Sequence, residues 1–141
     1  MESKYFKTQE LVDKEVYELI GDNAVNLLDE RLIETIDAVR EILDVPLICN
    51  DWQWGGTRTQ CGYRSAKSKV GAKKSFHKQG LAVDLYSKEM SAKEMRRRIK
   101  EYEDELPYPI RIEKWDANGE ITWLHIDLGD TQGDKIYFFK A

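Results

Sequence analysis

The spacing of hydrophobic residues changes twice along the chain, and these changes limit what it can fold into. From about residue 23 to residue 43, apolar side chains recur at steps of three and four residues, which predicts an amphipathic helix. A shorter helix is expected over residues 8–20, ended by Gly21. Between Trp52 and Gly80 this periodicity disappears and glycines interrupt the sequence, so a long irregular segment is expected there. Long loops within compact domains usually carry function, which makes this segment the first place to look for a site.

The rest of the chain combines strand-like runs with one more helix. A capping box of Ser91 and Glu94 predicts a helix that continues to about Leu106, just before two prolines. Strand-like runs cover residues 47–50, 81–86, 110–115, 121–128 and 136–139. This order, without the regular alternation of a doubly wound fold, predicts an α+β fold with an antiparallel sheet and packed helices. Because no repeat or linker divides the chain, residues 1–141 are expected to form a single domain.

Composition and charge exclude several classes of protein. Hydrophobic residues make up 41% of the chain and charged residues 34%, which is typical of a globular domain and not of a disordered or collagen-like chain. The net charge of −4 argues against a dedicated nucleic-acid binder. Apolar stretches are far shorter than the ~20 residues that cross a bilayer, so no membrane insertion is expected. The first residues lack the features of a secretory signal peptide, so cytoplasmic synthesis is expected. Cys49 and Cys61 lack a C-x-x-C spacing and are expected to be buried free thiols.

Only two histidines are present, and both lie where a metal site is favoured. His77 comes just before a strand-like run, and Asp84 follows it by seven residues, with a glycine between them at which the backbone can turn sharply. His125 lies inside a second strand, on the face that Trp123 and Asp127 share. Two imidazoles and one carboxylate are a familiar ligand set for catalytic zinc, because three protein ligands leave the fourth tetrahedral position open for water.

Three short motifs surround these residues. Residues 75–84, SFHKQGLAVD, match the pattern S-x-H-x-x-G-x-A-x-D. Upstream, CGYRS at residues 61–65 is close to S-G-Y-R-[ST], and downstream WLHID at residues 123–127 matches W-x-H-x-[DS]. In this order the three motifs resemble those of the zinc D-Ala-D-Ala carboxypeptidase family, which includes phage endolysins and shares its fold with the hedgehog signalling domain. Together they span about half of the chain.

This resemblance implies a hedgehog/DD-peptidase-like fold in which His77, Asp84 and His125 bind Zn²⁺. It also implies that Arg64 holds a carboxylate or carbonyl oxygen of the substrate, and that Ser75 supports the site rather than reacting. Arg64 suits this role because its forked guanidinium matches a carboxylate. Without the flanking motif, Arg64 would be interpreted as a solvated loop arginine.

The general base has to be argued locally, because the position three residues before His125, where many members of the family carry a glutamate, is a threonine here. Residues 116–119, DANG, suit a three-residue hairpin turn with a bulge, which pairs Glu113 with Trp123. Glu113 then shares the face of His125 and is the candidate base, while Glu120 points away. A two-residue Asn-Gly turn would reverse this preference, and an exposed strand carboxylate is the alternative interpretation of Glu113.

Two features leave alternatives open, and a third is expected at the surface. Between Thr57 and Gly80 the chain carries seven basic residues and no acid, which form either a solvated face or an attractive surface for an anionic wall polymer or a stem carboxylate. The four tryptophans are core residues or the floor of a sugar or peptide groove, with Trp123 as a substrate-binding residue. Residues 96–98, three consecutive arginines, are expected on the exposed face of their helix.

These features together predict a zinc metallopeptidase that hydrolyses peptide bonds in bacterial peptidoglycan stems. Both a D-Ala-D-Ala carboxypeptidase and an L,D- or D,D-endopeptidase fit. The expected partner is the peptide stem, with no nucleic acid, and a monomer is favoured. Synthesis without a signal peptide fits a phage or prophage lysin that reaches the wall through a membrane lesion or in a virion. The alternatives are a catalytically silent zinc-binding structural or virion module on the same fold and, as a weaker third, a nucleic-acid binder that uses the basic segment.

Overall fold

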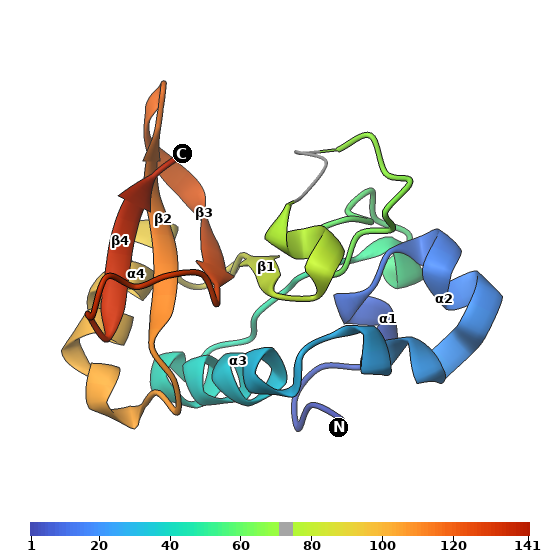
Figure 1. Ribbon diagram of the computed structural model, residues 1–141, viewed down its shortest axis with the longest axis horizontal. Coiled ribbons are helices and arrows are strands. Elements are labelled where there is room, and N and C mark those ends of the chain that lie inside the picture. The colour runs from blue at the N-terminus through green and yellow to red at the C-terminus, as the bar shows by residue number, and fades with distance from the viewer. Residues whose placement is uncertain (71–74) are drawn as a thin grey trace.

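Four strands form one mixed sheet in the order β1-β3-β2-β4 (Figure 1). The structure is a computed structural model and describes residues 1–70 and 75–141. Lys73 and Lys74 of the expected basic segment lie outside the described residues. The strands are β1 (Ala82–Leu85), β2 (Ile110–Asp116), β3 (Gly119–Asp127) and β4 (Ile136–Lys140).

Helices complete an α+β fold, as the sequence predicts. The α-helices are α1 (Thr8–Leu11), α2 (Lys14–Ile20), α3 (Glu30–Leu43) and α4 (Ala92–Glu101). The 3₁₀ helices are η1 (Gly21–Leu27), η2 (Trp52–Trp54), η3 (Phe76–Gln79) and η4 (Glu103–Glu105). Figure 1 shows β2, β3 and β4 on one side of the molecule, α1 and α2 on the other, and the short strand β1 between them. Among the described residues, no helix is long and apolar enough to cross a membrane.

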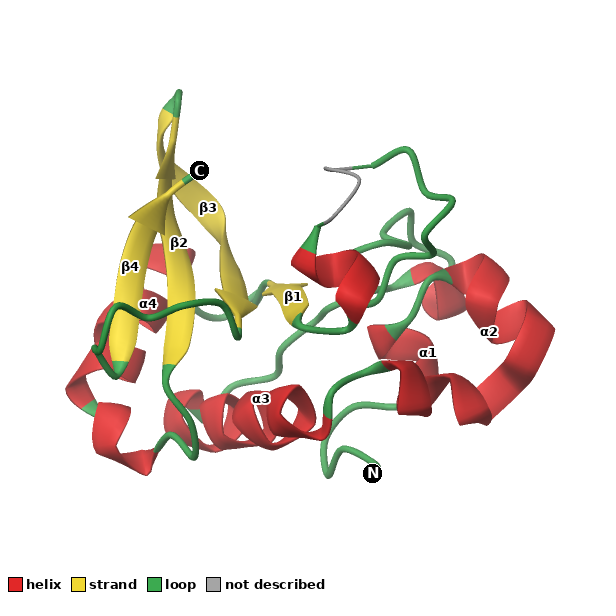
Figure 2. Ribbon diagram, in the orientation of Figure 1, coloured by secondary structure: helices red, strands yellow, loops and turns green. Residues whose placement is uncertain are grey.

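The sheet is not purely antiparallel, and the expectation was wrong at β4. Strand β3 runs antiparallel to both β1 and β2, but β4 pairs parallel with β2, with Ile136 opposite Ile110. Figure 2 shows why: the segment after β3 passes across β2 and starts β4 on the far edge of the sheet. A strand-like pattern identifies a strand but not the neighbour with which it pairs, so this crossing was not visible in the sequence.

Three expected helices are shorter or broken. The one expected to continue to about Leu106 ends at Glu101, and the other two change for local reasons. The helix expected over residues 8–20 is interrupted because Val12 forms a bridge with Tyr63, after which the side chain of Asp13 caps α2. The helix expected from about residue 23 begins only at Glu30, where the Asp29 carboxylate accepts a hydrogen bond from the Arg31 amide. In both cases an aspartate satisfies amides that the first turn of a helix leaves unpaired.

One hydrophobic core joins α3, α4 and the sheet. Alternate residues of the regular parts of the central strands are buried in it, as the two-residue period of a strand requires. These buried strand residues are Ile110, Ile112, Leu124 and Ile126. Their neighbours Glu113 and His125 lie on the opposite face of the sheet, only partly buried, so the core fixes the strands while this other face stays available for chemistry.

Candidate metal centre

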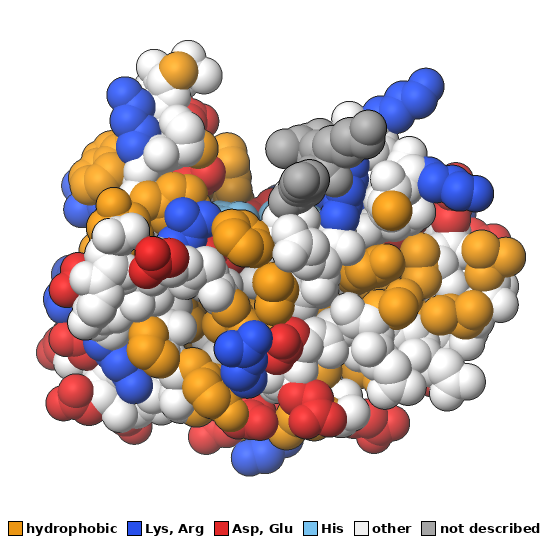
Figure 3. Space-filling view, viewed as in Figure 1, with side chains coloured by type: hydrophobic (Ala, Val, Ile, Leu, Met, Phe, Trp, Pro, Cys, Tyr) orange, Lys and Arg blue, Asp and Glu red, His pale blue; other side chains and the backbone are white. Residues whose placement is uncertain are grey.

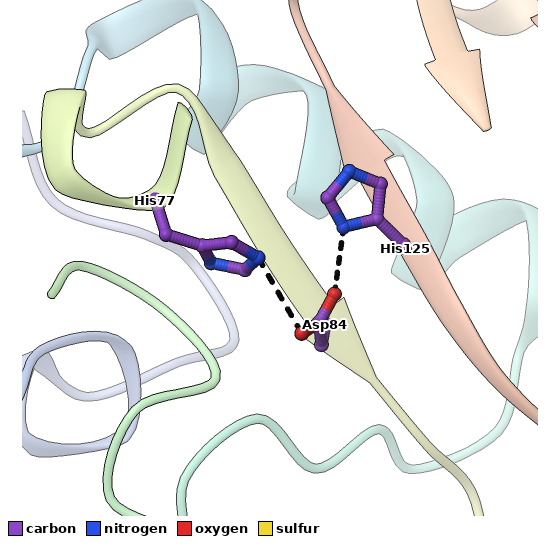
Figure 4. A group of neighbouring side chains, drawn as sticks. All are labelled: His77, Asp84 and His125. Carbon is purple, nitrogen blue, oxygen red and sulfur yellow. Dashed lines mark hydrogen bonds and ion pairs between the residues drawn. The ribbon is translucent and has the colours of Figure 1, made fainter. Parts of the chain in front are cut away.

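His77, Asp84 and His125 converge at one point, each from a different element (Figure 4). One ligand atom of each residue lies within 4.8 Å of those of the other two. The Asp84 carboxylate is between the imidazoles, 2.8 Å from Nδ1 of His125 and 3.4 Å from Nε2 of His77. The three residues predicted from the sequence as metal ligands therefore form a group that can hold one metal ion.

The short helix η3 places His77. The hydroxyl of Ser75 accepts a hydrogen bond from the His77 amide and so caps η3. Gly80 ends η3 with a left-handed φ of +71°, and a Cβ at this position would lie 2.0 Å from the carbonyl oxygen of Leu27. Only glycine fits both the backbone conformation and this close approach.

Residues 61–64 form a backbone link between β1 and the N-terminal helices. The carbonyl of Cys61 accepts from the Asp84 amide, and the Arg64 amide donates to the carbonyl of His77. On the other side, the Tyr63 amide donates to the carbonyl of Leu11 at 2.7 Å. This segment therefore joins the elements that carry His77 and Asp84 through its backbone.

Both imidazoles are oriented through the ring nitrogen that points away from the convergence point. Nδ1 of His77 donates to the carbonyl of Gly62 at 3.0 Å, which leaves Nε2 facing Asp84. Nε2 of His125 donates to the carboxylate of Asp127 at 2.8 Å, which leaves Nδ1 facing Asp84. Metal-binding histidines in proteins are held in this way by an acceptor behind the ring, so the donor set fits a metal.

Asp127 is in turn held by Arg111. The guanidinium of Arg111 donates two hydrogen bonds to the Asp127 carboxylate, at 2.7 and 3.0 Å, and the Gly129 amide donates a third at 2.9 Å. Arg111 also lies 4.0 Å from the ring centre of Phe139, so its own position is fixed by packing. Asp127 is only 1% exposed, and these partners allow it to remain charged there.

The electrostatics of the group favour ionised carboxylates. Burial raises the pKa of Asp84, but the hydrogen bonds and charges of His125 and His77 outweigh it and hold that pKa well below its ordinary value. Burial lowers the pKa of His125, yet its hydrogen bonds to Asp127 and Asp84 are stronger and raise it to about 9. Protonated His125 donates one hydrogen bond to each of two carboxylates. The proton on Nδ1, which faces Asp84, occupies a position that a metal cation can take.

Glu113 lies on the face of His125, as expected, but it is paired directly with His125 on the neighbouring strand and not with Trp123. The hairpin turn has two residues between the paired Asp116 and Gly119, one fewer than predicted. A register shift at Lys114 then returns Glu113 to the His125 face. Burial raises the pKa of the Glu113 carboxyl, and the charge of His125 only partly opposes this.

Arg96 supports this irregular part of β3, contrary to the expectation that it is exposed. Its guanidinium donates to the carbonyls of Ile121 and Trp123 at 2.9 and 3.2 Å, and lies 3.5 Å from Glu120. The side chain is 3% exposed. Glu120 therefore lies against α4 and away from the metal centre, as the sequence analysis predicts.

Arg64 lies beside the metal centre. A terminal nitrogen of its guanidinium is 3.7 Å from the Asp84 carboxylate, and Nε donates to the carbonyl of Gln60 at 2.7 Å. Its side chain is 11% exposed, so it is not the solvated loop arginine of the alternative interpretation. Trp123 lies on β3 two residues before His125 and is partly exposed.

The site opens to the surface. Figure 3 shows histidine surface at the base of a hollow beside the β2–β3 hairpin.

Cys49 is buried and Cys61 is partly buried. Both are free thiols, as the sequence analysis expects, and burial raises the pKa of each.

Sequence reasoning missed the orienting roles of Asp127 and Arg111, and it also missed Asn50. Asn50 is fully buried, and its side chain donates to the carbonyl of Val12 at 2.9 Å and accepts from the Cys61 amide at 2.8 Å. It thereby fixes the start of the segment that supports His77 and Asp84. Its only signal in the sequence is a polar residue directly after an apolar run, which is too common to identify such a role.

Comparisons with known proteins gave no relatives. No protein-family model, no curated protein and no solved structure matches the chain.

Proposed function

We propose that this chain is a zinc-dependent peptidase that cuts peptide bonds in the stems of bacterial peptidoglycan, and that it belongs with the zinc D-Ala-D-Ala carboxypeptidases that its motifs resemble. The observation that carries the proposal is the convergence of His77 Nε2, the Asp84 carboxylate and His125 Nδ1. Two imidazole nitrogens and one carboxylate oxygen are the donors of a three-ligand hydrolytic zinc site.

When bound, zinc supplies a water acidic enough to react near neutral pH and polarises the carbonyl that is attacked. Glu113 carries out the proton transfers in this proposal. It lies opposite His125, and its carboxyl group has a raised pKa. Its carboxylate accepts the proton of the attacking water and delivers it to the leaving amine, so that the peptide bond breaks into a carboxylate and an amine. A carboxyl group with a raised pKa is better matched to this transfer than an ordinary glutamate.

Arg64 binds the substrate in this proposal. Its guanidinium lies beside Asp84, and among the described residues it makes one hydrogen bond, to Gln60, out of the five N–H groups that it offers. A planar fork of donors suits the carboxylate or a carbonyl oxygen of a short peptide. Exposed lysines on the same segment, Lys67 and Lys69, add positive charge that attracts an anionic stem.

The test is mass spectrometry of the soluble fragments that zinc-loaded protein releases from purified peptidoglycan. Loss of single D-alanine residues would identify a carboxypeptidase, and larger stem fragments an endopeptidase. Glu113→Gln should reduce product formation at least ~100-fold, the contribution of a general base. Glu120→Gln, a glutamate on the opposite face of the neighbouring strand, is the matched control and should stay active.

The opposite result is equally informative. A zinc-loaded parent that releases nothing from several wall types would contradict the peptidase proposal. The silent zinc module would then be the better account, because it requires a bound metal but no turnover.

A further inference from the structure

We propose that a groove lined in part by Lys88, four residues after Asp84, binds the glycan strand to which the peptide stem is attached, with Trp54 and Tyr5 as its contact residues. This inference rests on the proposed function. The groove has a volume of about 450 Å³, within the usual range of ligand sites. Besides these two residues, Phe6, Glu10, Arg40, Lys88 and residues 46–48 line it.

The loop that carries Trp54 is well hydrogen-bonded and holds the indole at the surface. The carbonyl of Asp51 accepts hydrogen bonds from the amides of Trp54 and Gly56, and its carboxylate accepts from the Arg58 amide at 2.8 Å. A Cβ at Gly56 would lie 2.2 Å from that carboxylate, so the closed loop requires glycine there. Despite this tight construction, the Trp54 side chain is left 62% exposed. An indole held outward by a well-bonded loop contributes little to the core, which favours a role in contacting a ligand.

Tyr5 lines the same groove from the N-terminal segment. It is 45% exposed, and the guanidinium of Arg40 lies 5.2 Å from its ring centre. The arginine supports one side of the ring and restricts its motion. Two aromatic rings from segments far apart in the sequence therefore line one hollow.

The chemistry of the lining selects a neutral, hydroxylated ligand. Aromatic faces pack against the C–H face of a sugar ring, while Arg40 and Lys88 offer N–H donors to hydroxyl and acetamido oxygens. The carboxylate of Glu10, which also lines the groove, offers an acceptor to hydroxyl groups, so the lining combines aromatic faces with hydrogen-bonding groups of both kinds. A polymer of N-acetylated hexosamines satisfies both kinds of surface.

The position of the groove relative to Asp84 supports the glycan as occupant. Lys88 follows Asp84 by four residues, so their Cα atoms are at most about 13 Å apart at ~3.3 Å per extended residue. Ile48 in the groove is paired with Tyr86, two residues beyond Asp84. A peptide stem covers a similar distance with about four residues. A glycan in the groove therefore places the first few stem residues within reach of the metal centre.

The experiment is a titration with the tetramer of β-1,4-linked N-acetylglucosamine, followed by calorimetry and by tryptophan fluorescence. The parent should show saturable binding with a change in indole emission. Trp54→Ala and Tyr5→Ala should each weaken binding by about 10-fold, the upper end of what one aromatic contact supplies. Trp115→Ala and Tyr102→Ala are matched controls, since these rings are 40% and 44% exposed but lie outside the groove, and they should leave the affinity unchanged. No saturable binding, or equal affinity in Trp54→Ala, would overturn the inference.

A second variant separates this inference from the proposed function. His125→Ala should bind the tetramer as the parent does while failing to release wall fragments. If the parent releases wall fragments but does not bind the tetramer, the glycan-binding inference is wrong and the peptidase proposal is unaffected. Saccharide binding by a parent without hydrolysis would contradict the proposed peptidase and leave the groove standing.

Discussion

Glu113 and His125 are paired residues on the adjacent strands β2 and β3, and Asp84 is paired with His125 from the other side. Three neighbouring strands thus place the candidate base, one imidazole ligand and the carboxylate ligand side by side on one face. Backbone pairing fixes the spacing of these groups more firmly than a loop would, which suits a site that must hold several groups in register.

Replacing Asp127 with asparagine should weaken zinc binding without removing a ligand. The substitution keeps the size of the side chain but removes the negative charge that orients and polarises His125. We expect the zinc affinity to fall by about 10-fold to 100-fold, the usual effect of losing such a partner. Competition against a chelating dye would measure it, with the exposed Asp130→Asn as control. An unchanged affinity would mean that Asp127 serves only the fold.

Zinc should stabilise the protein more at alkaline pH. The metal-free His125 has a pKa of about 9, above its ordinary 6.5. Such a group stabilises the fold fully below its unfolded pKa, and this contribution is lost as the pH rises through the folded value. Because zinc takes the place of that proton, the rise in Tm on adding zinc should be larger at about pH 8.5 than at about pH 6.5. Melting curves with and without zinc would show this, and a larger rise at the lower pH would refute it.

Gly80→Ala should destabilise the protein far more than Gly55→Ala. Both glycines are left-handed, with φ of +71° and +88°, so both alanines carry a similar backbone cost of about 1 kcal/mol. Only at Gly80 would the new Cβ lie 2.0 Å from a backbone oxygen, that of Leu27, whereas Gly55 has nothing within 4 Å. We expect about 3 kcal/mol or more for Gly80→Ala by urea denaturation. Equal losses in the two variants would show that the close approach at Leu27 relaxes freely.

Arg96→Ala should cost stability that Arg97→Ala does not. Arg96 is buried and bonded to the carbonyls of Ile121 and Trp123, which would lose their partner. The expected loss is about 3 kcal/mol in the free energy of unfolding. Arg97, whose ion pairs with Glu94 and Glu101 are exposed, should leave the free energy of unfolding almost unchanged. Chemical denaturation of both variants tests this, and similar values would remove Arg96 from the support of β3.

Two members of the candidate metal group, His77 and Asp84, could be predicted from the sequence because they lie in one short motif, whereas His125, 41 residues after Asp84, was predicted from a separate motif. Ser75, His77 and Asp84 share one turn and one strand, so local geometry decides much of their arrangement. The α+β class followed equally from local periodicity. Glu113 was placed on the correct face, but through a turn and a register that the structure corrects.

What could not be predicted depends on contacts between distant segments. The parallel pairing of β4 with β2 depends on where a connecting loop crosses the sheet. The burial of Arg96 depends on carbonyls that an irregularity in β3 leaves unpaired, 25 and 27 residues further along the chain. Asn50 likewise acts through segments brought together only by folding.

The most direct test of the account is to titrate zinc into metal-free protein while measuring both bound metal and hydrolysis of purified peptidoglycan. We predict that activity rises in proportion to bound zinc, reaches its limit at one equivalent, and disappears with a chelator. His125→Ala should lack both the bound zinc and the activity. Hydrolysis that is equally fast without metal, or one zinc retained by His125→Ala, would contradict the assignment of His77, Asp84 and His125 as the catalytic metal centre.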